Sequence, residues 1–488
     1  MQNVQNIASK SRLEGESSVK KAILNWVDKN ETDLITLSDD IWAHAELGLV
    51  EHKSAKAQMG YLEKQGFHIA AGVGGMETAF VASWGTGQPV IGFLGEFDAL
   101  PSVSNKPVPY QDPLVPGGTG HGCGHNLLGV AAIAGAVALK AHMQAEGLVG
   151  EVRYFGCPAE ESSFGKTWMV RDGVFDDVDI VLTWHPGDSN SVKNAHSLAD
   201  FVLKFDFHGK TAHASGDPWN GRSALDGVEL MNAGIERMRE HMRLDSRVHY
   251  VISAGGGAPN VVPGYAQNFF DVRAADIAEL KRMRSWVLDI AKGAALMTQT
   301  RVEEIFVGCA ANVIPNRAIA KELHAVMEEI GVPQWTEAEL KFAAEMQSQF
   351  APEAVKSGID SLEAAGAILP QTSIHATLMP YSDTIEGGKG STDVGDVTWV
   401  VPTAQFSTAC RAIGVPGHSW AVTSCSGMSI GHKGMLYAAK VLGLAGYRYL
   451  TDPALREEAY AEWKHQLKGR EYEVLIPEQI KVPPLPFA

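Results

Sequence analysis

Five side chains able to bind a metal ion follow strand-like or Gly-rich segments of the sequence: Cys123, His125, Glu161, His185 and His418. Taken singly, the cysteine is typical of a small buried residue and each histidine of a surface or hydrogen-bonded one. The recurrence of such residues after successive predicted strands favours a metal site instead. Thiolate, imidazole and carboxylate together suit Zn²⁺ or Mn²⁺ better than Ca²⁺ or Mg²⁺. We therefore expect two divalent metal ions, with coordination positions left open for water and a substrate carbonyl.

The adjacent pair Glu160 and Glu161 offers a second kind of chemistry. Neighbouring residues of an extended strand point in opposite directions, but in a turn after a strand their side chains can diverge by about the width of a water molecule. One carboxylate can then bind metal while the other takes a proton from water. A solvated acidic pair is the ordinary alternative, and the strand that precedes Cys157-Pro158 argues against it.

Further polar residues could assist. Asp98, which follows a predicted strand, could orient a metal-binding histidine from behind, although it could equally be an ordinary turn residue. His213, Asn260 and Arg273 are types that polarise a carbonyl and hold a carboxylate. The alternative for Asn260 and Arg273 is turn stabilisation and a surface ion pair. The Gly run at 255–257 does not precede a helix, which argues against a phosphate site.

Short apolar runs that alternate with helical patterns position these residues. We expect strands at 90–94, 152–155 and 180–183, and helices at 33–45, 127–139 and 432–446. This order is typical of an α/β fold with a mixed, mostly parallel sheet and helices on both faces. Its polar residues collect just after the strands, where such sheets carry their sites. The stretch 338–390 has no clear pattern.

A different order interrupts this fold. Residues 200–208, 246–253, 266–273 and 301–306 read as strands, and 223–242 and 277–297 as helices. The resulting order β-α-β-β-α-β is that of a ferredoxin-like α+β unit. We predict an inserted domain at 198–308 and a metal-binding domain made of 1–197 and 309–488.

Composition narrows the class of protein. The net charge of −16 argues against nucleic acid and anionic membranes as partners. The most apolar stretch, 127–139, is shorter than the roughly 20 residues that span a bilayer, and the polar N-terminus does not resemble a signal peptide. Five cysteines fit a reducing compartment rather than a disulfide framework. We expect a cytoplasmic enzyme.

Together the motifs resemble the M20 metallopeptidase superfamily, in particular its amidohydrolase branch. The resemblance lies in Gly95-Glu96-Phe97-Asp98-Ala99-Leu100, in His121 to His125, in Pro158-Ala159-Glu160-Glu161, and in the later histidines His185 and His418-Ser419. In the insert it lies in Gly209 to Ala214 and in Pro259-Asn260-Val261-Val262-Pro263. The chain departs from the branch at Asn126, where aspartate is common, and at Thr392 and Val394.

The resemblance implies a role for each residue. Cys123, His125, Glu161, His185 and His418 would bind two metals, Glu160 would be the general base and then the acid, and Asp98 would support a ligand. The insert would act as a lid and form a homodimer, in which His213 reaches the partner's active site to stabilise the oxyanion. Asn260 and Arg273 would hold the α-carboxylate of a small-molecule substrate.

Finer features, such as Gly431-His432-Lys433-Gly434-Met435, are similar to a subgroup of the branch that hydrolyses p-aminobenzoyl-glutamate. We therefore expect cleavage of that amide. One alternative is a dipeptidase or N-acyl-amino-acid hydrolase that uses the same site. Another is a weakly active member of a hetero-oligomer with a sister chain, against which the retained base and ligands argue.

Overall fold

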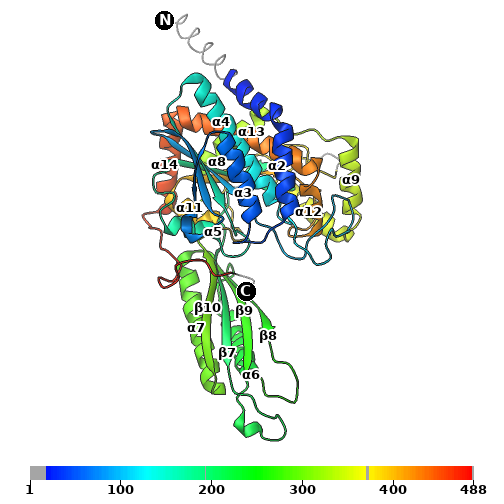
Figure 1. Ribbon diagram of the computed structural model, residues 1–488, viewed down its shortest axis with the longest axis vertical. Helices are drawn as coiled ribbons and strands as arrows, with labels where there is room; N and C mark the ends of the chain where they lie inside the picture. Colours follow the sequence, from blue (N-terminus) through cyan, green and yellow to red (C-terminus); the bar gives the residue numbers. More distant parts are fainter. Residues whose placement is uncertain (1–17, 193, 370–372, 389, 486–488) are drawn as a thin grey trace, which may run out of the picture.

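The computed structural model describes residues 18–192, 194–369, 373–388 and 390–485, and it contains a seven-stranded and a four-stranded sheet (Figure 1). The larger sheet has the order β1-β2-β4-β3-β5-β11-β6. The bounds of its strands are β1 His68–Ala71, β2 Phe80–Thr86, β3 Val90–Glu96, β4 Gly150–Cys157, β5 Ile180–Gly187, β6 Ser191–Val192 and β11 Thr403–Ala409. Strands β4, β3, β5 and β11 run parallel, whereas β1, β2 and β6 are antiparallel to their neighbours. The sheet is therefore mixed, with a parallel centre.

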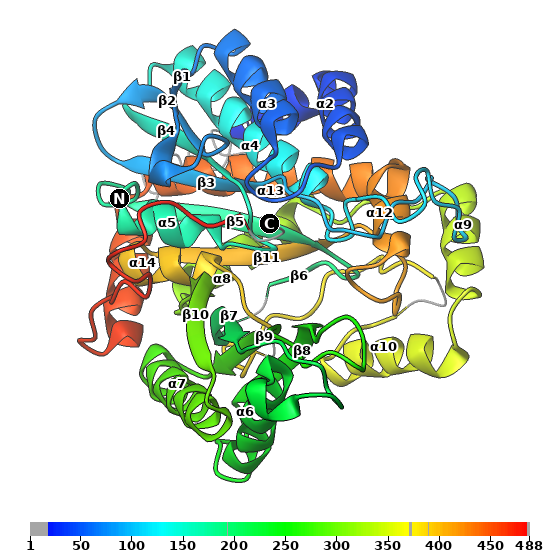
Figure 2. The same ribbon diagram turned by 60° about the horizontal axis from the view of Figure 1, so that its bottom comes forward.

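Helices cover both faces of this sheet (Figure 2). Helices α4 and α13 pack against each other and against β3 and β5 on one face, while α5 and α11 lie on the other. The helices outside the four-stranded unit include α2 Glu31–His44, α3 His52–Lys64, α4 His125–Glu146, α5 Gly165–Arg171, α8 Arg317–Ile330, α9 Glu337–Gln347, α10 Pro352–Ala364, α11 Val394–Val400, α12 Trp420–Ser426, α13 Ser429–Thr451 and α14 Pro453–Leu467.

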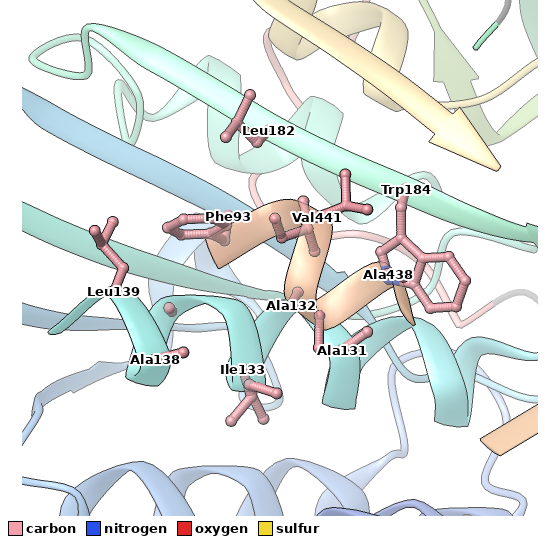
Figure 3. Packing of buried hydrophobic residues seen from close by; sticks show 14 of the residues in the cluster. Phe93, Ala131, Ala132, Ile133, Ala138, Leu139, Leu182, Trp184, Ala438 and Val441 are labelled. Atoms are coloured by element: carbon pink, nitrogen blue, oxygen red, sulfur yellow. The ribbon is translucent and has the colours of Figure 1, made fainter. Parts of the chain in front are cut away.

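The core follows from the alternation of side chains along the central strand β3, all of which is buried. Phe93 faces the cluster around α4 and α13, and its neighbour Leu94 faces the cluster on the other side. Figure 3 shows Phe93, Leu182 and Trp184 of the sheet against the small residues Ala131 and Ala132 of α4 and Ala438 and Val441 of α13. Small side chains let both helices approach the sheet closely, which fixes the strand ends that carry the polar residues.

The second sheet has the order β10-β7-β9-β8 and is antiparallel throughout. Its elements are β7 Ala199–His208, α6 Ala224–Arg239, β8 Arg247–Ala254, β9 Tyr265–Ala274, α7 Ile277–Thr298 and β10 Arg301–Ala310. The chain order is the β-α-β-β-α-β order predicted from the sequence. This unit projects from the larger sheet in Figure 1, with α6 and α7 packed on one face of its strands.

The sequence missed several elements. Strand β11, which lies inside the large sheet, and the helices α9 and α10 of the unpatterned stretch were not predicted. The helix that contains the apolar stretch 127–139 is longer than predicted: α4 has 22 residues and is long and apolar enough to cross a membrane by length and composition. However, 89 % of its apolar window is buried inside the protein, as in a core helix. All five cysteines are free, as predicted.

The contact between α4 and α13 gives a matched pair of glycine substitutions. A Cβ atom at Gly135 would lie 2.7 Å from Leu442 Cβ and 3.2 Å from the backbone nitrogen of Gly443, so Gly135→Ala should force the helices apart and lower the free energy of unfolding by about 1 kcal/mol. Gly60, inside helix α3, has no atom within 4 Å of that position. Gly60→Ala should raise the free energy of unfolding by about 0.5–1 kcal/mol. Urea denaturation curves compare both, and equal signs would contradict this packing.

Candidate metal centre

The five predicted metal-binding residues converge at the carboxyl ends of the parallel strands. Cys123 and His125 lie at the start of α4, Glu161 follows β4, His185 lies near the end of β5, and His418 precedes α12. Their ligand atoms fall into two groups that share Cys123, one with His125 and His185 and the other with Glu161 and His418. Within each group all ligand atoms lie within 4.8 Å of one another. Two neighbouring metal positions with a common thiolate fit this arrangement.

Gly124 allows Cys123 and His125 to reach one point. It precedes α4 with a φ of +83°, a left-handed conformation that favours glycine, and a Cβ atom there would meet the ring of Pro186 at 3.2 Å. The Cys123 Sγ atom then lies 3.3 Å from His185 Nε2, and His185 Nδ1 donates to the carbonyl of Pro186 at 2.9 Å. This bond leaves Nε2 as the ligand atom. Burial lowers the pKa of His185 to about 4, so its ring is neutral, the form that binds metal.

Asp98 holds residues of both groups at once. Its Oδ1 atom lies 2.8 Å from His125 Nδ1, and its Oδ2 atom accepts a hydrogen bond from the backbone N–H of Glu161 at 2.9 Å. The carboxyl is completely buried, and although burial raises its pKa, His125 and the N–H of Glu161 hold that pKa below its usual range. The first bond fixes the hydrogen of His125 on Nδ1 and directs Nε2 to the metal position, the role that the resemblance implies for Asp98.

The turn after β4 separates Glu160 from Glu161. Ala159 has a φ of +58°, and its N–H donates to the buried carboxylate of Glu51 at 2.8 Å, which anchors the turn. Glu161 Oε1 lies 3.4 Å from His418 Nε2, whereas Glu160 belongs to a different group with Glu96 and His125. Burial, with Glu96 and Glu161 nearby, holds the pKa of Glu160 well above its usual range. A raised pKa makes a carboxylate a stronger proton acceptor and lets the carboxyl hold a proton until it is passed on.

A buried charge network that the sequence reasoning missed borders this site. Lys166 Nζ lies 2.6 Å from Glu96 Oε1 and 2.5 Å from Asp393 Oδ1, and all three residues are buried. Glu96 could have been found, because it lies two residues before Asp98 and so shares its side of the strand. Nothing in the sequence around Lys166 indicated that it is buried, since most lysines are exposed to solvent.

Three unpartnered atoms test whether divalent metals fit this site: Glu96 Oε2, His125 Nε2 and Glu161 Oε1 are buried and have no hydrogen-bond partner. His125 Nε2 faces Glu96 Oε2 at 3.2 Å, and with the ring hydrogen on Nδ1 both atoms present lone pairs. Such a pair needs a cation between or beside its members. Burial lowers the pKa of His125, but Cys123, Asp98 and Glu96 hold this pKa well above its usual range. Their negative charges therefore favour a positive charge at this position. The residues therefore fit divalent metal ions.

His418 forms the open side of the site. Its side chain is 61 % exposed and its backbone has a φ of +50°, a conformation that is strained for a residue with a Cβ atom. By contrast, Cys123 is half-buried, and burial together with Glu161 raises the pKa of its thiol to about 12. A bound metal would have to displace that proton, as it does at thiolate sites generally. His418 is thus the most exposed member of the predicted ligand set.

The structure does not bring the three insert residues together. His213 and Asn260 are exposed and share a loop cluster, in which Ala214 N–H donates to the Asn260 carbonyl. Arg273 lies at the other end of β9, whose ten residues span about 30 Å. Within one chain Asn260 and Arg273 therefore lie too far apart to hold the same carboxylate, and their joint role in binding it stays a prediction that would need residues of two chains. Arg273 already pairs with Asp200 at 3.2 Å and Asp271 at 2.9 Å, and its part in substrate binding stays a prediction.

Asn126, the departure from the family pattern, lies outside the metal groups. Its side-chain amide donates to Ser38 Oγ and to the Ser426 carbonyl, both at 3.0 Å. An ionised aspartate could not donate these bonds, which tie the start of α4 to α2 and α12. The substitution therefore belongs to the local packing, and the ligand set is unaffected by it.

Asp98→Asn should weaken metal binding while the fold is kept. The amide has nearly the same shape but loses the charge that supports His125, so we expect the metal dissociation constant to rise by about 10- to 100-fold. Competition with a fluorescent chelator measures this constant. Asp177→Asn, which changes an exposed carboxylate that pairs with Arg153, is the control. Equal affinity in the two variants would contradict the role of Asp98.

Comparison with known proteins places this site in a family. The family model for peptidase family M20/M25/M40 matches residues 92–441. The chain is 39 % identical to one of the two subunits of p-aminobenzoyl-glutamate hydrolase of Escherichia coli K12, over 92 % of this chain and 95 % of that protein. It is 27 % identical to the Xaa-Arg dipeptidase of Mus musculus, with 92 % and 93 % covered, and 30 % identical to the other subunit of the E. coli hydrolase, with 72 % and 74 % covered.

Solved structures show the same fold. An aminobenzoyl-glutamate utilization protein from Klebsiella pneumoniae matches with a TM-score of 0.57 at 20 % identity, over 86 % of this chain and 97 % of that one. The Bacillus subtilis YXEP protein, a dinuclear metal-binding peptidase of family M20, matches with a TM-score of 0.55 at 16 % identity, over 87 % and 99 %. The chain belongs to the peptidase family M20/M25/M40, as its motifs indicated, and is a hydrolase of amide bonds that uses divalent metal ions.

Proposed function

We propose that this protein hydrolyses the amide bond of p-aminobenzoyl-glutamate, giving p-aminobenzoate and glutamate. The observation that carries the proposal is the arrangement of the two glutamates in the turn after β4. Glu161 groups with Cys123 and His418, whereas Glu160 lies beside His125 and has a raised pKa. The 39 % identity to a hydrolase named for this substrate supports the choice of substrate.

The reaction needs one proton acceptor that later becomes a donor. Bound divalent ions supply positive charge that polarises a substrate carbonyl and acidifies a water molecule. Glu160 accepts a proton from the attacking water as its oxygen bonds to the carbonyl carbon. The same carboxyl then returns that proton to the amide nitrogen as the C–N bond breaks. Glu96 keeps negative charge next to Glu160 and raises its pKa, while Lys166 limits that rise.

Cys123, His125, Glu161, His185 and His418 are the residues that we propose as ligands for Zn²⁺ or Mn²⁺. A ligand set with one thiolate and three imidazoles favours zinc, and the carboxylate Glu161 is compatible with either ion. We assign the protein to the cytoplasm on the basis of its five free cysteines, since unpaired thiols are typical of proteins in a reducing compartment.

The unit formed by 198–308 is proposed as a separate ferredoxin-like domain that serves as lid and dimer contact. Strand β8 ends its sheet and exposes Val251 and Ile252, with exposed fractions of 59 % and 46 %. An open edge strand with apolar side chains is suited to pairing with a second copy. His213 Nδ1 accepts from the N–H of Gly216 at 2.9 Å, so Nε2 carries the hydrogen and can donate to an oxyanion in a partner's site, where Asn260 would accompany it.

Two other functions use the same residues. The 27 % identity to an Xaa-Arg dipeptidase favours a dipeptide or another N-acyl amino acid as a second candidate substrate, which a panel of amides would separate. The E. coli relatives are named as two different subunits of one hydrolase, which supports a hetero-oligomer of this chain with a sister chain. Assays with and without a sister chain distinguish that arrangement from a homodimer.

Glu160→Ala should lower kcat on p-aminobenzoyl-glutamate by about 100- to 10,000-fold, because the reaction loses its proton carrier. Elemental analysis should show two metals retained per chain. Glu161→Ala is the contrast, since it should lose metal as well as activity. Wild-type turnover by Glu160→Ala protein that retains both metals would contradict the role of Glu160 as the base.

Mixing two inactive proteins tests the shared site. Glu160→Ala and His213→Ala should each be nearly inactive, because one lacks the proton carrier and the other the donor to the oxyanion. In a mixed dimer one site combines an intact Glu160 with an intact His213 of the other chain, so unfolding and refolding an equal mixture should restore about a quarter of wild-type activity. Absence of recovery, with dimers verified by sedimentation, would contradict a donor supplied across the dimer.

A further inference from the structure

A cavity of about 380 Å³ opens beside the metal groups and is not explained by the reaction above. His185 forms part of its wall, and the same ring lies 3.3 Å from the Cys123 sulphur. The lining also includes His196, Gln405 and Ser407 of β11, and Arg411, just after that strand. A volume near the lower end of the range for small-molecule sites suits half of a substrate whose scissile bond lies at the metals.

Arg411 is the cation of this cavity. Within the described residues its guanidinium has no ion pair and no hydrogen bond, and its Nε atom is buried without an acceptor. Arg273, the residue that the sequence suggested for binding a carboxylate, is instead held by two aspartates. A buried N–H without an acceptor is costly, and a guanidinium is the side chain best shaped to hold a carboxylate through two parallel bonds. Arg411 is therefore free for a ligand, whereas Arg273 is already paired.

The rest of the cavity lining contains one residue that would repel an anion. Asp188 is the only carboxylate among the described residues that line the cavity, and no ion pair joins it to Arg411. It stands next to His375, whose pKa is lowered mainly by burial and to which Asp188 contributes in the opposite direction. Arginine and aspartate thus offer opposite charges to one ligand from the same cavity, which makes them a matched pair for mutation.

We propose that this cavity is the subsite for the carboxylate-bearing amino-acid half of the substrate, with Arg411 as the residue that binds its carboxylate and determines specificity. The inference rests on the proposed function for the identity of the substrate. It assigns the glutamyl side to the wall between His185 and Arg411, so that the acyl side lies toward the exposed His418.

Binding of glutarate, a dicarboxylate without an amide, tests the subsite independently of turnover. Titration calorimetry with the metal-loaded protein should show that Arg411→Gln raises the dissociation constant by about 10- to 100-fold. Arg411→Lys should lose less, because it keeps the charge, and Asp188→Asn should bind glutarate more tightly. Arg237→Gln, an exposed arginine of α6, is the control with the same substitution. Unchanged affinity in Arg411→Gln, with metal content and melting temperature equal to wild type, overturns the proposal.

Kinetics identify which carboxylate is held. If Arg411 binds the γ-carboxylate, Arg411→Gln should lower kcat/KM for p-aminobenzoyl-glutamate but not for p-aminobenzoyl-leucine. If it binds the α-carboxylate, both values should fall, and no change in either rejects the subsite. Should the wild-type protein fail to hydrolyse p-aminobenzoyl-glutamate while Arg411 still controls glutarate binding, the proposed substrate is wrong and the anion subsite stands. Where Arg411→Gln does not fold, the opposite shifts expected of Arg411→Lys and Asp188→Asn decide the question, and two shifts of the same sign reject it.

Discussion

One carboxylate organises the metal centre. Asp98 bonds the ring of His125 through one oxygen and the backbone N–H of Glu161 through the other, at 2.8 and 2.9 Å. These two residues belong to different metal groups, so the relative position of the groups depends on a single buried side chain at the end of β3. Parallel packing of β3 with β4 and β5 makes this possible, because it places the ends of three strands at one edge of the sheet.

The site concentrates negative charge where water is excluded. Glu96, Asp98, Glu160, Glu161 and Asp393 lie close together, and within the described residues Lys166 is the buried lysine that offsets them. Burying so many carboxylates is unfavourable unless cations neutralise them. Two divalent ions meet that requirement and at the same time provide the chemistry of amide hydrolysis. The positive charge that stabilises these buried carboxylates is therefore the same charge that the reaction needs.

The two cavities next to the metal groups differ in the state of their arginines. In the cleft between the sheets, which Glu161 also lines, Arg273 is neutralised by Asp200 and Asp271. On the other side, beside His185, Arg411 has no such partner among the described residues. A strongly negative chain binds an anionic substrate only through local positive charge. An arginine that is already paired contributes little of it, so availability rather than residue type decides where the substrate's carboxylate binds.

The sequence alone determined the chemistry and the class of fold. Ligand types that recur after buried strands identified Cys123, His125, Glu161, His185 and His418, because metal ions demand particular atoms and parallel sheets collect them at one edge. Hydrophobic periodicity gave the central strands and the order of the insert. It missed β11, although that strand lies within the sheet, because its residues Thr403–Ala409 are short and partly polar.

Only the tertiary structure decided which residues share a site. Asn260 and Arg273 are thirteen positions apart in the sequence, yet Asn260 lies in the loop before β9 and Arg273 lies near the far end of that strand. Lys166 and Asp393 are 227 positions apart and form an ion pair in the core. Whether a charge is paired or free, as for Arg273 and Arg411, depends on neighbours that the chain brings together by folding. Residue type and spacing specify what a side chain can do, and three-dimensional packing specifies what it meets.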